Sequence, residues 1–112
     1  MSDIKLTKDA DALICLIYKY YLELRGSGIS KSKAKSLGSS EKINQNIIPE
    51  WPFDDVEEAC RELHRNALLD ISYYDNICAI VHLSDDGIVY MENRFFDKLK
   101  SLLDYIDKIK FW

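Results

Sequence analysis

A change in hydrophobic period after Ala67 constrains the fold of this chain more than any other feature of its sequence. Up to that point apolar residues recur at intervals of three or four positions, as on one face of a helix. The stretches 69–74 and 77–83 are instead rich in β-branched and aromatic residues. Asp75 and Asn76, which both tolerate positive φ, separate them. The sequence therefore predicts one β-hairpin in an otherwise helical chain.

Three helical segments are predicted at the beginning of the chain. Thr7 caps the first, which ends at the glycine-rich stretch 26–28. Ser30 caps a short helix that Gly38 stops, and Ser39 caps a third that ends before Pro49. These caps predict one long helix followed by two short ones.

A fourth helix is predicted from Asp54 to about Asn66. Asp54 and Glu57, three residues apart, resemble a capping box, in which each side chain bonds a free backbone N–H group of the first turn. The positions expected to be buried are Val56, Ala59, Cys60, Leu63 and Ala67. Tyr73 and Tyr74, in the strand that follows, are expected to face opposite ways, one into the core and one half exposed.

A last helix is predicted from about residue 87 to 109, with Ser84 as its cap and Asp85 and Asp86 as acids of its first turn. Its distal apolar residues are spaced four and three apart, as in a heptad seam. They are Phe95, Leu99, Leu102, Ile106 and Ile109. We expect this stripe to form a homodimer interface, and packing against the first helix is the alternative.

Helices, a hairpin and a closing helix in this order predict an α+β, helix-rich fold: a winged helix-turn-helix with a short two-stranded wing and a long C-terminal helix. Four short motifs add a resemblance: Ile29-Ser30-Lys31-Ser32, Ser39-Ser40, Trp51-x-Phe53, and the ending Leu83-Ser84-x-x-Gly87. Over residues 9 to 95 they are similar to the small YjcQ-like winged-helix proteins of Gram-positive bacteria and their prophages. The resemblance implies a winged helix, and winged helices bind either DNA or protein.

Charge divides along the chain and leaves both kinds of ligand open. Lysines gather upstream of the fourth helix, and two arginines lie on it, where a recognition helix would enter the major groove. The candidate residues for contact with double-stranded DNA are Lys31, Lys33, Lys35, Lys42, Arg61 and Arg65. The leading hypothesis is a dimeric bacterial or phage transcriptional regulator. However, the fourth helix is acidic and the formal net charge is −4. This charge favours the alternative hypothesis, a protein-interaction module that docks its acidic helix 54–66 on a basic protein. A phage-encoded inhibitor of a nucleic-acid enzyme would be one example.

The remaining composition narrows the class of protein. With 112 residues, 47% of them hydrophobic, residues 1–112 are expected to form one domain. No apolar run is long enough for a membrane span, so a cytoplasmic protein is expected. The cysteines lie far apart in apolar segments and are expected to be buried free thiols. No enzyme motif, cofactor motif or complete metal-ligand set is recognised, and Cys60 with His64 supplies only part of one.

Overall fold

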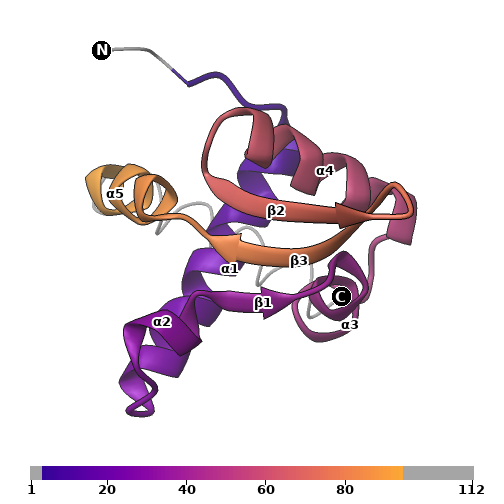
Figure 1. Ribbon diagram of the computed structural model, residues 1–112. Coiled ribbons are helices and arrows are strands. Elements are labelled where there is room, and N and C mark those ends of the chain that lie inside the picture. The colour runs from indigo at the N-terminus through magenta and orange to yellow at the C-terminus, as the bar shows by residue number, and fades with distance from the viewer. Residues whose placement is uncertain (1–3, 95–112) are drawn as a thin grey trace.

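The computed structural model describes residues 4–94 of the chain. Its elements, in order, are α1 (Lys8–Gly26), α2 (Lys31–Ala34), β1 (Ser36–Gly38), α3 (Ser40–Asn46), α4 (Phe53–Arg65), β2 (Leu69–Tyr74), β3 (Ile77–Leu83) and α5 (Asp85–Arg94). The three strands form one antiparallel sheet in the order β1-β3-β2. The sheet forms one layer and α1 crosses behind it (Figure 1). The predicted α+β class is confirmed, and the order of the elements is compatible with the predicted winged helix.

Apolar faces of the helices and the inner face of the sheet form a single core. The largest side chains in it that are almost fully buried are Leu13, Ile14, Ile17, Ile43, Val56, Leu63, Leu68, Leu69, Val81, Leu83 and Met91. They come from every helix except α2 and from both long strands. Burial of apolar surface, worth roughly 25 cal/mol per Å², therefore joins these elements into one packed unit.

The predicted two-stranded hairpin is present, but the sheet also has a third strand, β1, in a stretch that was predicted to be helical. The short helix α2 ends at Ala34 instead of continuing to Gly38, and β1 pairs with β3 through Ser36 opposite His82 and Gly38 opposite Val81. The pairing is long-range and buries Leu37, so tertiary contacts override the local helical pattern. Gly38 has a φ of 81°, which explains the glycine at the end of this strand.

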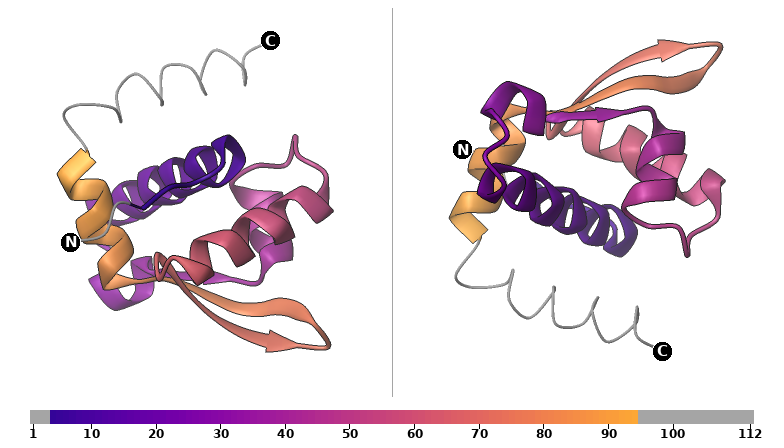
Figure 2. Two further views of the ribbon diagram at one scale, coloured as in Figure 1. Left: turned by 90° about the horizontal axis from the view of Figure 1, so that it is seen from above. Right: turned by 90° about the horizontal axis from the view of Figure 1, so that it is seen from below.

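The hairpin has the predicted strands and the predicted turn. Asp75 and Asn76 adopt φ values of 50° and 64°, as a type I′ turn requires. The tip projects away from the helices (Figure 2). The expectation that one of the two tyrosines lies in the core is therefore wrong, since Tyr73 is 42% exposed and Tyr74 is 74% exposed.

Helix α4 lies within one residue of its predicted bounds, but the details at its two ends differ from the prediction. The helix begins at Phe53 after Pro52 and has no side-chain cap, so Asp54 and Glu57 do not form a capping box. At its other end, Leu68 N–H donates to the Leu63 carbonyl at 2.9 Å, and Ala67 N–H to the His64 carbonyl at 2.9 Å. This pair of bonds is a Schellman motif. Ala67 occupies its left-handed position with a φ of 62° and is exposed, so its predicted burial is wrong.

Helix α5 begins as predicted, with the Ser84 Oγ accepting from Gly87 N–H at 2.8 Å. At its far end Arg94 forms an ion pair with Asp11 of α1, with 2.5 Å between Nη1 and Oδ1. This pair joins the end of α5 to the start of α1. The predicted dimer interface, from Phe95 to Ile109, lies outside the described residues. No helix in residues 4–94 is long and apolar enough to cross a membrane.

Candidate interaction face

The hairpin carries a group of exposed apolar side chains. Seven large apolar side chains are exposed in the described part of the chain, and four of them belong to β2 and β3. They are Tyr73, Tyr74, Ile77 and Ile80. Single exposed apolar residues are normal, but a group on one projecting element is typical of an interaction site.

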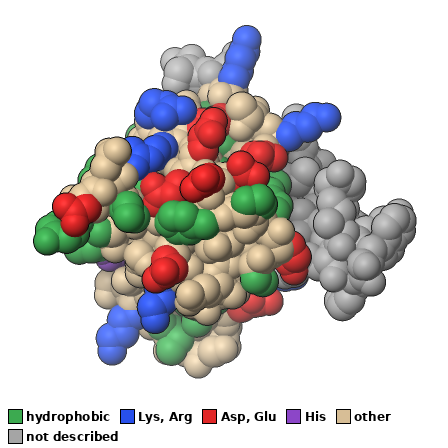
Figure 3. Space-filling model, turned by 90° about the vertical axis from the view of Figure 1, so that its right-hand side faces the viewer, with side chains coloured by type: hydrophobic (Ala, Val, Ile, Leu, Met, Phe, Trp, Pro, Cys, Tyr) green, Lys and Arg blue, Asp and Glu red, His purple; other side chains and the backbone are tan. Residues whose placement is uncertain are grey.

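The outer side of α4, next to the hairpin, is acidic. Asp54 and Glu58, one helical turn apart, are both exposed and form no ion pair with another described residue. Like charges at this spacing repel each other, and the first-turn position of Asp54 offsets part of that cost through the helix dipole. Figure 3 views the molecule from the hairpin-tip side and shows acidic side chains interspersed with apolar ones.

A groove lies between this side of α4 and the hairpin tip. It has a volume of about 430 Å³ and is lined by Phe53, Asp54, Glu57, Glu58, Arg61, Asn76 and Ile77. Its walls thus combine an aromatic ring and an aliphatic side chain with carboxylates. We call these seven residues the groove, and the groove together with exposed Tyr74, which lies opposite Ile77 across the hairpin, the interaction face.

Glu57 and Arg61 form the floor of the groove and hold the hairpin to α4. The Glu57 carboxylate accepts from the Ser40 hydroxyl, from Cys78 N–H at 3.2 Å and from Arg61 Nη2 at 3.3 Å. Arg61 also donates to the Asn76 carbonyl in the turn. Because Glu57 and Arg61 neutralise each other, the free charge of the groove is that of Asp54 and Glu58.

Tyr73 joins the hairpin to α4 on the other side of Arg61. The Arg61 guanidinium lies 5.0 Å from the centre of the Tyr73 ring, and the Tyr73 hydroxyl lies 3.1 Å from His64 Nδ1. Burial raises the pKa of Tyr73 above its ordinary value. Arg61, one of the predicted DNA-binding residues, is therefore engaged within the molecule, and so is His64.

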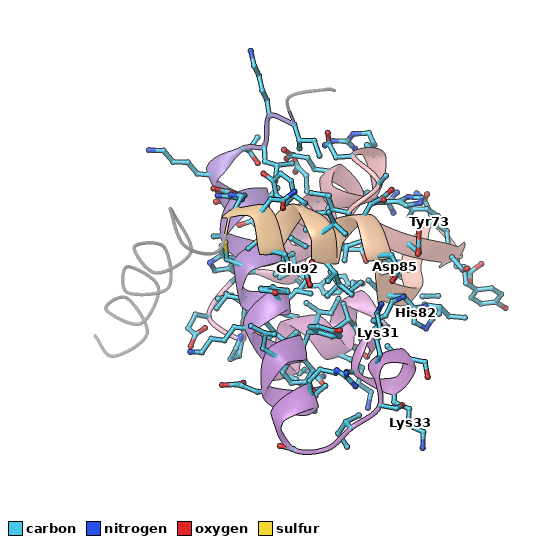
Figure 4. All side chains as sticks on the ribbon, turned by 90° about the vertical axis from the view of Figure 1, so that its left-hand side faces the viewer. Lys31, Lys33, Tyr73, His82, Asp85 and Glu92 are labelled. Carbon is cyan, nitrogen blue, oxygen red and sulfur yellow. The ribbon has the colours of Figure 1, made fainter. Side chains whose placement is uncertain are left out.

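Two of the four predicted DNA-binding lysines are also paired within the molecule. Lys35 Nζ lies 2.6 Å from Asp85 Oδ1, and Lys31 Nζ lies 3.7 Å from the same atom. The hydrogen bond from Lys35, with the nearby charges of both lysines, holds the pKa of Asp85 below its ordinary value. Figure 4 shows Lys31 close to Asp85, with Lys33 further along α2. Asp85, which was predicted only as a first-turn acid of the last helix, thus neutralises part of the charge of the predicted DNA-binding lysines.

Lys33, Lys42 and Arg65 are exposed and form no ion pair with another described residue. They belong to α2, α3 and the end of α4. Helix α2 lies beside β1 and the end of α4 leads into β2, so these two lie at opposite edges of the sheet, while α3 packs against α4 (Figure 1). The six predicted DNA-binding residues therefore do not form one continuous basic surface.

Glu62, which counted toward the acidity of α4, has a structural contact. Its carboxylate accepts from the backbone N–H and from the hydroxyl of Thr7, both at 2.7 Å. Thr7 also accepts from Ala10 N–H at 3.3 Å, as its predicted capping role requires. Glu62 therefore connects α4 to the start of α1.

All three cysteines are buried free thiols, as predicted. Burial raises the pKa of Cys15 to about 12 and that of Cys78 to about 11, and it raises the pKa of Cys60 as well. A thiol that keeps its proton is a poor nucleophile and a poor metal ligand. Within the described residues no group of three or more His, Cys, Asp or Glu side chains could hold a metal ion.

Sequence reasoning did not single out Ile77 or Ile80, and it used Phe53 only as part of the Trp51-x-Phe53 motif. A signal for the two isoleucines was present, because positions 77 to 81 are apolar without the alternation that a half-buried strand shows. A strand at the tip of a projecting hairpin has too few neighbours to bury both of its faces. No comparable signal placed Phe53 beside the turn, since that contact depends on how α4 packs against the sheet.

Comparison of the chain with protein-family models, with curated proteins and with solved structures found no match. The resemblance to YjcQ-like proteins therefore stays a prediction. The interaction face is the feature of the structure that bears most directly on function.

Proposed function

We propose that this chain is a winged-helix module that binds a protein partner through the interaction face. The order of its helices and strands and the strand order β1-β3-β2 support the winged-helix assignment. In that assignment α4 is the recognition helix and the β2–β3 hairpin is the wing. The observation that carries the proposal is the chemistry of the surface between them, which combines exposed apolar side chains with unpaired carboxylates.

The same surface is poorly suited to duplex DNA. Phosphate contacts supply most of the non-specific affinity of DNA-binding proteins, and they require exposed Lys or Arg. On the outer side of α4, Asp54 and Glu58 are unpaired, whereas Arg61 is bound to Glu57 and to the turn. The turn itself is Asp75-Asn76 and offers no cation to the minor groove. Exposed apolar residues beside these carboxylates are instead typical of a protein-binding surface.

The experiment that tests this proposal is selection of a displayed library of random 12-residue peptides against the purified chain. We expect enriched sequences that combine basic with large apolar residues and that lose binding to an Asp54→Lys, Glu58→Lys variant. Reversal of Glu57 or Glu62 would be a poor test, because Glu57 accepts from Cys78 N–H and Glu62 from Thr7. The matched control is Lys33→Glu, Lys42→Glu, which changes exposed charge elsewhere. A selection without enrichment, or binders unaffected by the α4 variant, would refute the proposal.

DNA binding as a dimeric transcriptional regulator is the second candidate. It is favoured by the winged-helix order of elements and by the exposure of Lys33, Lys42 and Arg65. Under this candidate a generic labelled duplex binds at low salt and dissociates as salt rises, with about one unit of log–log slope lost for each phosphate contact removed. Fluorescence anisotropy with the Lys33→Ala, Lys42→Ala, Arg65→Ala variant measures that slope.

We also propose that the protein acts in the cytoplasm as a homodimer, paired through the apolar stripe from Phe95 to Ile109. The heptad-like spacing of that stripe supports the dimer. Light scattering coupled to size-exclusion chromatography tests it, with Leu99→Glu, Leu102→Glu as the disrupting variant. A monomeric wild type at about 100 µM, a concentration at which even weak specific dimers form, would contradict it.

A further inference from the structure

We infer that the groove binds an arginine side chain of the partner, presented by an exposed segment in which large apolar residues flank that arginine. This inference rests on the proposed protein-binding function and names the chemistry of the partner. It follows from the size, the charge and the wall composition of the groove.

The groove carries negative charge that no described cation neutralises. Asp54 and Glu58 project from the same side of α4 into the groove lining and lack a cationic partner among the described residues. The other carboxylate of the lining, Glu57, is saturated by Ser40, Cys78 and Arg61. Two unneutralised carboxylates one helical turn apart can accept the planar donors of a guanidinium from both sides.

The shape of the groove suits a side chain better than an enclosed small molecule. The groove is open to solvent and has a volume of about 430 Å³. Phe53 and Ile77 supply apolar walls, against which the three methylene groups of an arginine can pack while its head group reaches the carboxylates. Lysine has a compact ammonium that cannot bridge two carboxylates in this planar manner, so arginine is favoured.

Apolar surface continues beyond the groove at the hairpin tip. Ile77 of the groove lies opposite Tyr74 across the hairpin, and Tyr74 is exposed. A partner segment with apolar residues next to its arginine therefore covers the hairpin tip as well. A second copy of this chain is a poor occupant of the groove, because its acidic face would be repelled by the unpaired carboxylates. A basic partner would be attracted by them.

The test is a titration of the ¹⁵N-labelled full chain with acetyl-Leu-Arg-Leu-amide, followed by amide chemical shifts. We expect saturable shifts for the amides of Asp54, Glu58, Asn76 and Ile77. Acetyl-Leu-Glu-Leu-amide is expected to cause none. The Asp54→Asn, Glu58→Gln variant should weaken the arginine peptide by roughly tenfold or more, the loss expected from charge-assisted hydrogen bonds. The exposed Asp70→Asn variant is the control and should bind as the wild type does.

The inference is overturned if the arginine peptide produces no saturable shifts up to about 10 mM, where even a dissociation constant of 1 mM would be evident. It is also overturned if the glutamate peptide shifts the same amides, or if Asp54→Asn, Glu58→Gln leaves binding unchanged. These outcomes differ from failure of the proposed function. A library peptide that binds tightly but shifts amides elsewhere would leave the protein-binding function standing and refute the arginine site alone.

Discussion

Replacing Glu57 with alanine should destabilise the protein far more than replacing its exposed neighbour Glu58. The Glu57 side chain is only 12% exposed, and it accepts hydrogen bonds from α3, α4 and β3 at once. Its loss leaves the Cys78 N–H and the hydroxyl of fully buried Ser40 without their acceptor. Each unsatisfied buried polar group costs about 1–3 kcal/mol. Water entering through the groove would relieve part of that cost, so we expect a loss of about 3 kcal/mol in the free energy of unfolding.

Urea denaturation at pH 7, followed by circular dichroism at 222 nm, measures this loss. With a slope of about 1.5 kcal/mol/M, the midpoint of Glu57→Ala should fall by about 2 M. The control variant Glu58→Ala should stay within about 0.5 kcal/mol of the wild type, as exposed substitutions usually do. Equal midpoints for the two variants would refute the reasoning that Glu57 is a buried connector between three elements.

Three further predictions concern backbone geometry and the buried thiols. Ala67→Gly should stabilise the protein by about 0.5–1 kcal/mol, because the residue has a φ of 62° and glycine adopts this conformation without the cost of a Cβ. Thermal unfolding measures the stabilisation, and an unchanged or lower midpoint temperature would contradict the prediction. Gly87→Ala should lower the free energy of unfolding by about 1–3 kcal/mol, because a Cβ at this position collides with the Leu68 carbonyl oxygen. Gly26→Ala is the control, because a Cβ at Gly26 meets nothing within 4 Å. Equal losses of stability in the two variants would disprove the close approach at Gly87. Burial raises the pKa of Cys15 from 9.0 to about 12, so the contribution of this thiol to stability is present in full below pH 9 and is lost between pH 9 and about 12. The free energy of unfolding of Cys15→Ala should therefore decline less than that of the wild type over this pH range. Parallel curves of unfolding free energy against pH for the two proteins would argue against a buried protonated thiol.

Much of the fold could be predicted from local signals. The bounds of β2 and β3 and their turn followed from β-forming residues on either side of Asp75-Asn76. Helix caps at Thr7, Ser30 and Ser39 followed from side chains that can accept a first-turn N–H. In each case the physical cause lies within a few residues of the sequence, so no knowledge of the tertiary structure was needed.

What could not be predicted depends on partners distant in sequence. Strand β1 exists because Ser36 and Gly38 pair with β3, more than forty residues away. Glu57 looked like a capping residue, yet its partners lie on α3 and β3. Asp85, read as a helix-start acid, holds Lys31 and Lys35. The same limit applies to the site, because counting charges along the chain could not show which lysines and arginines are already paired.

The most direct test of the central claim is the affinity of a library-selected peptide for two variants of opposite design, measured by fluorescence anisotropy. We predict that Asp54→Lys, Glu58→Lys weakens binding by at least tenfold, about 1.4 kcal/mol. Lys33→Glu, Lys42→Glu should leave the affinity unchanged. Unchanged affinity in the first variant, or a loss confined to the second, would contradict the account and move the binding surface away from α4 and the hairpin.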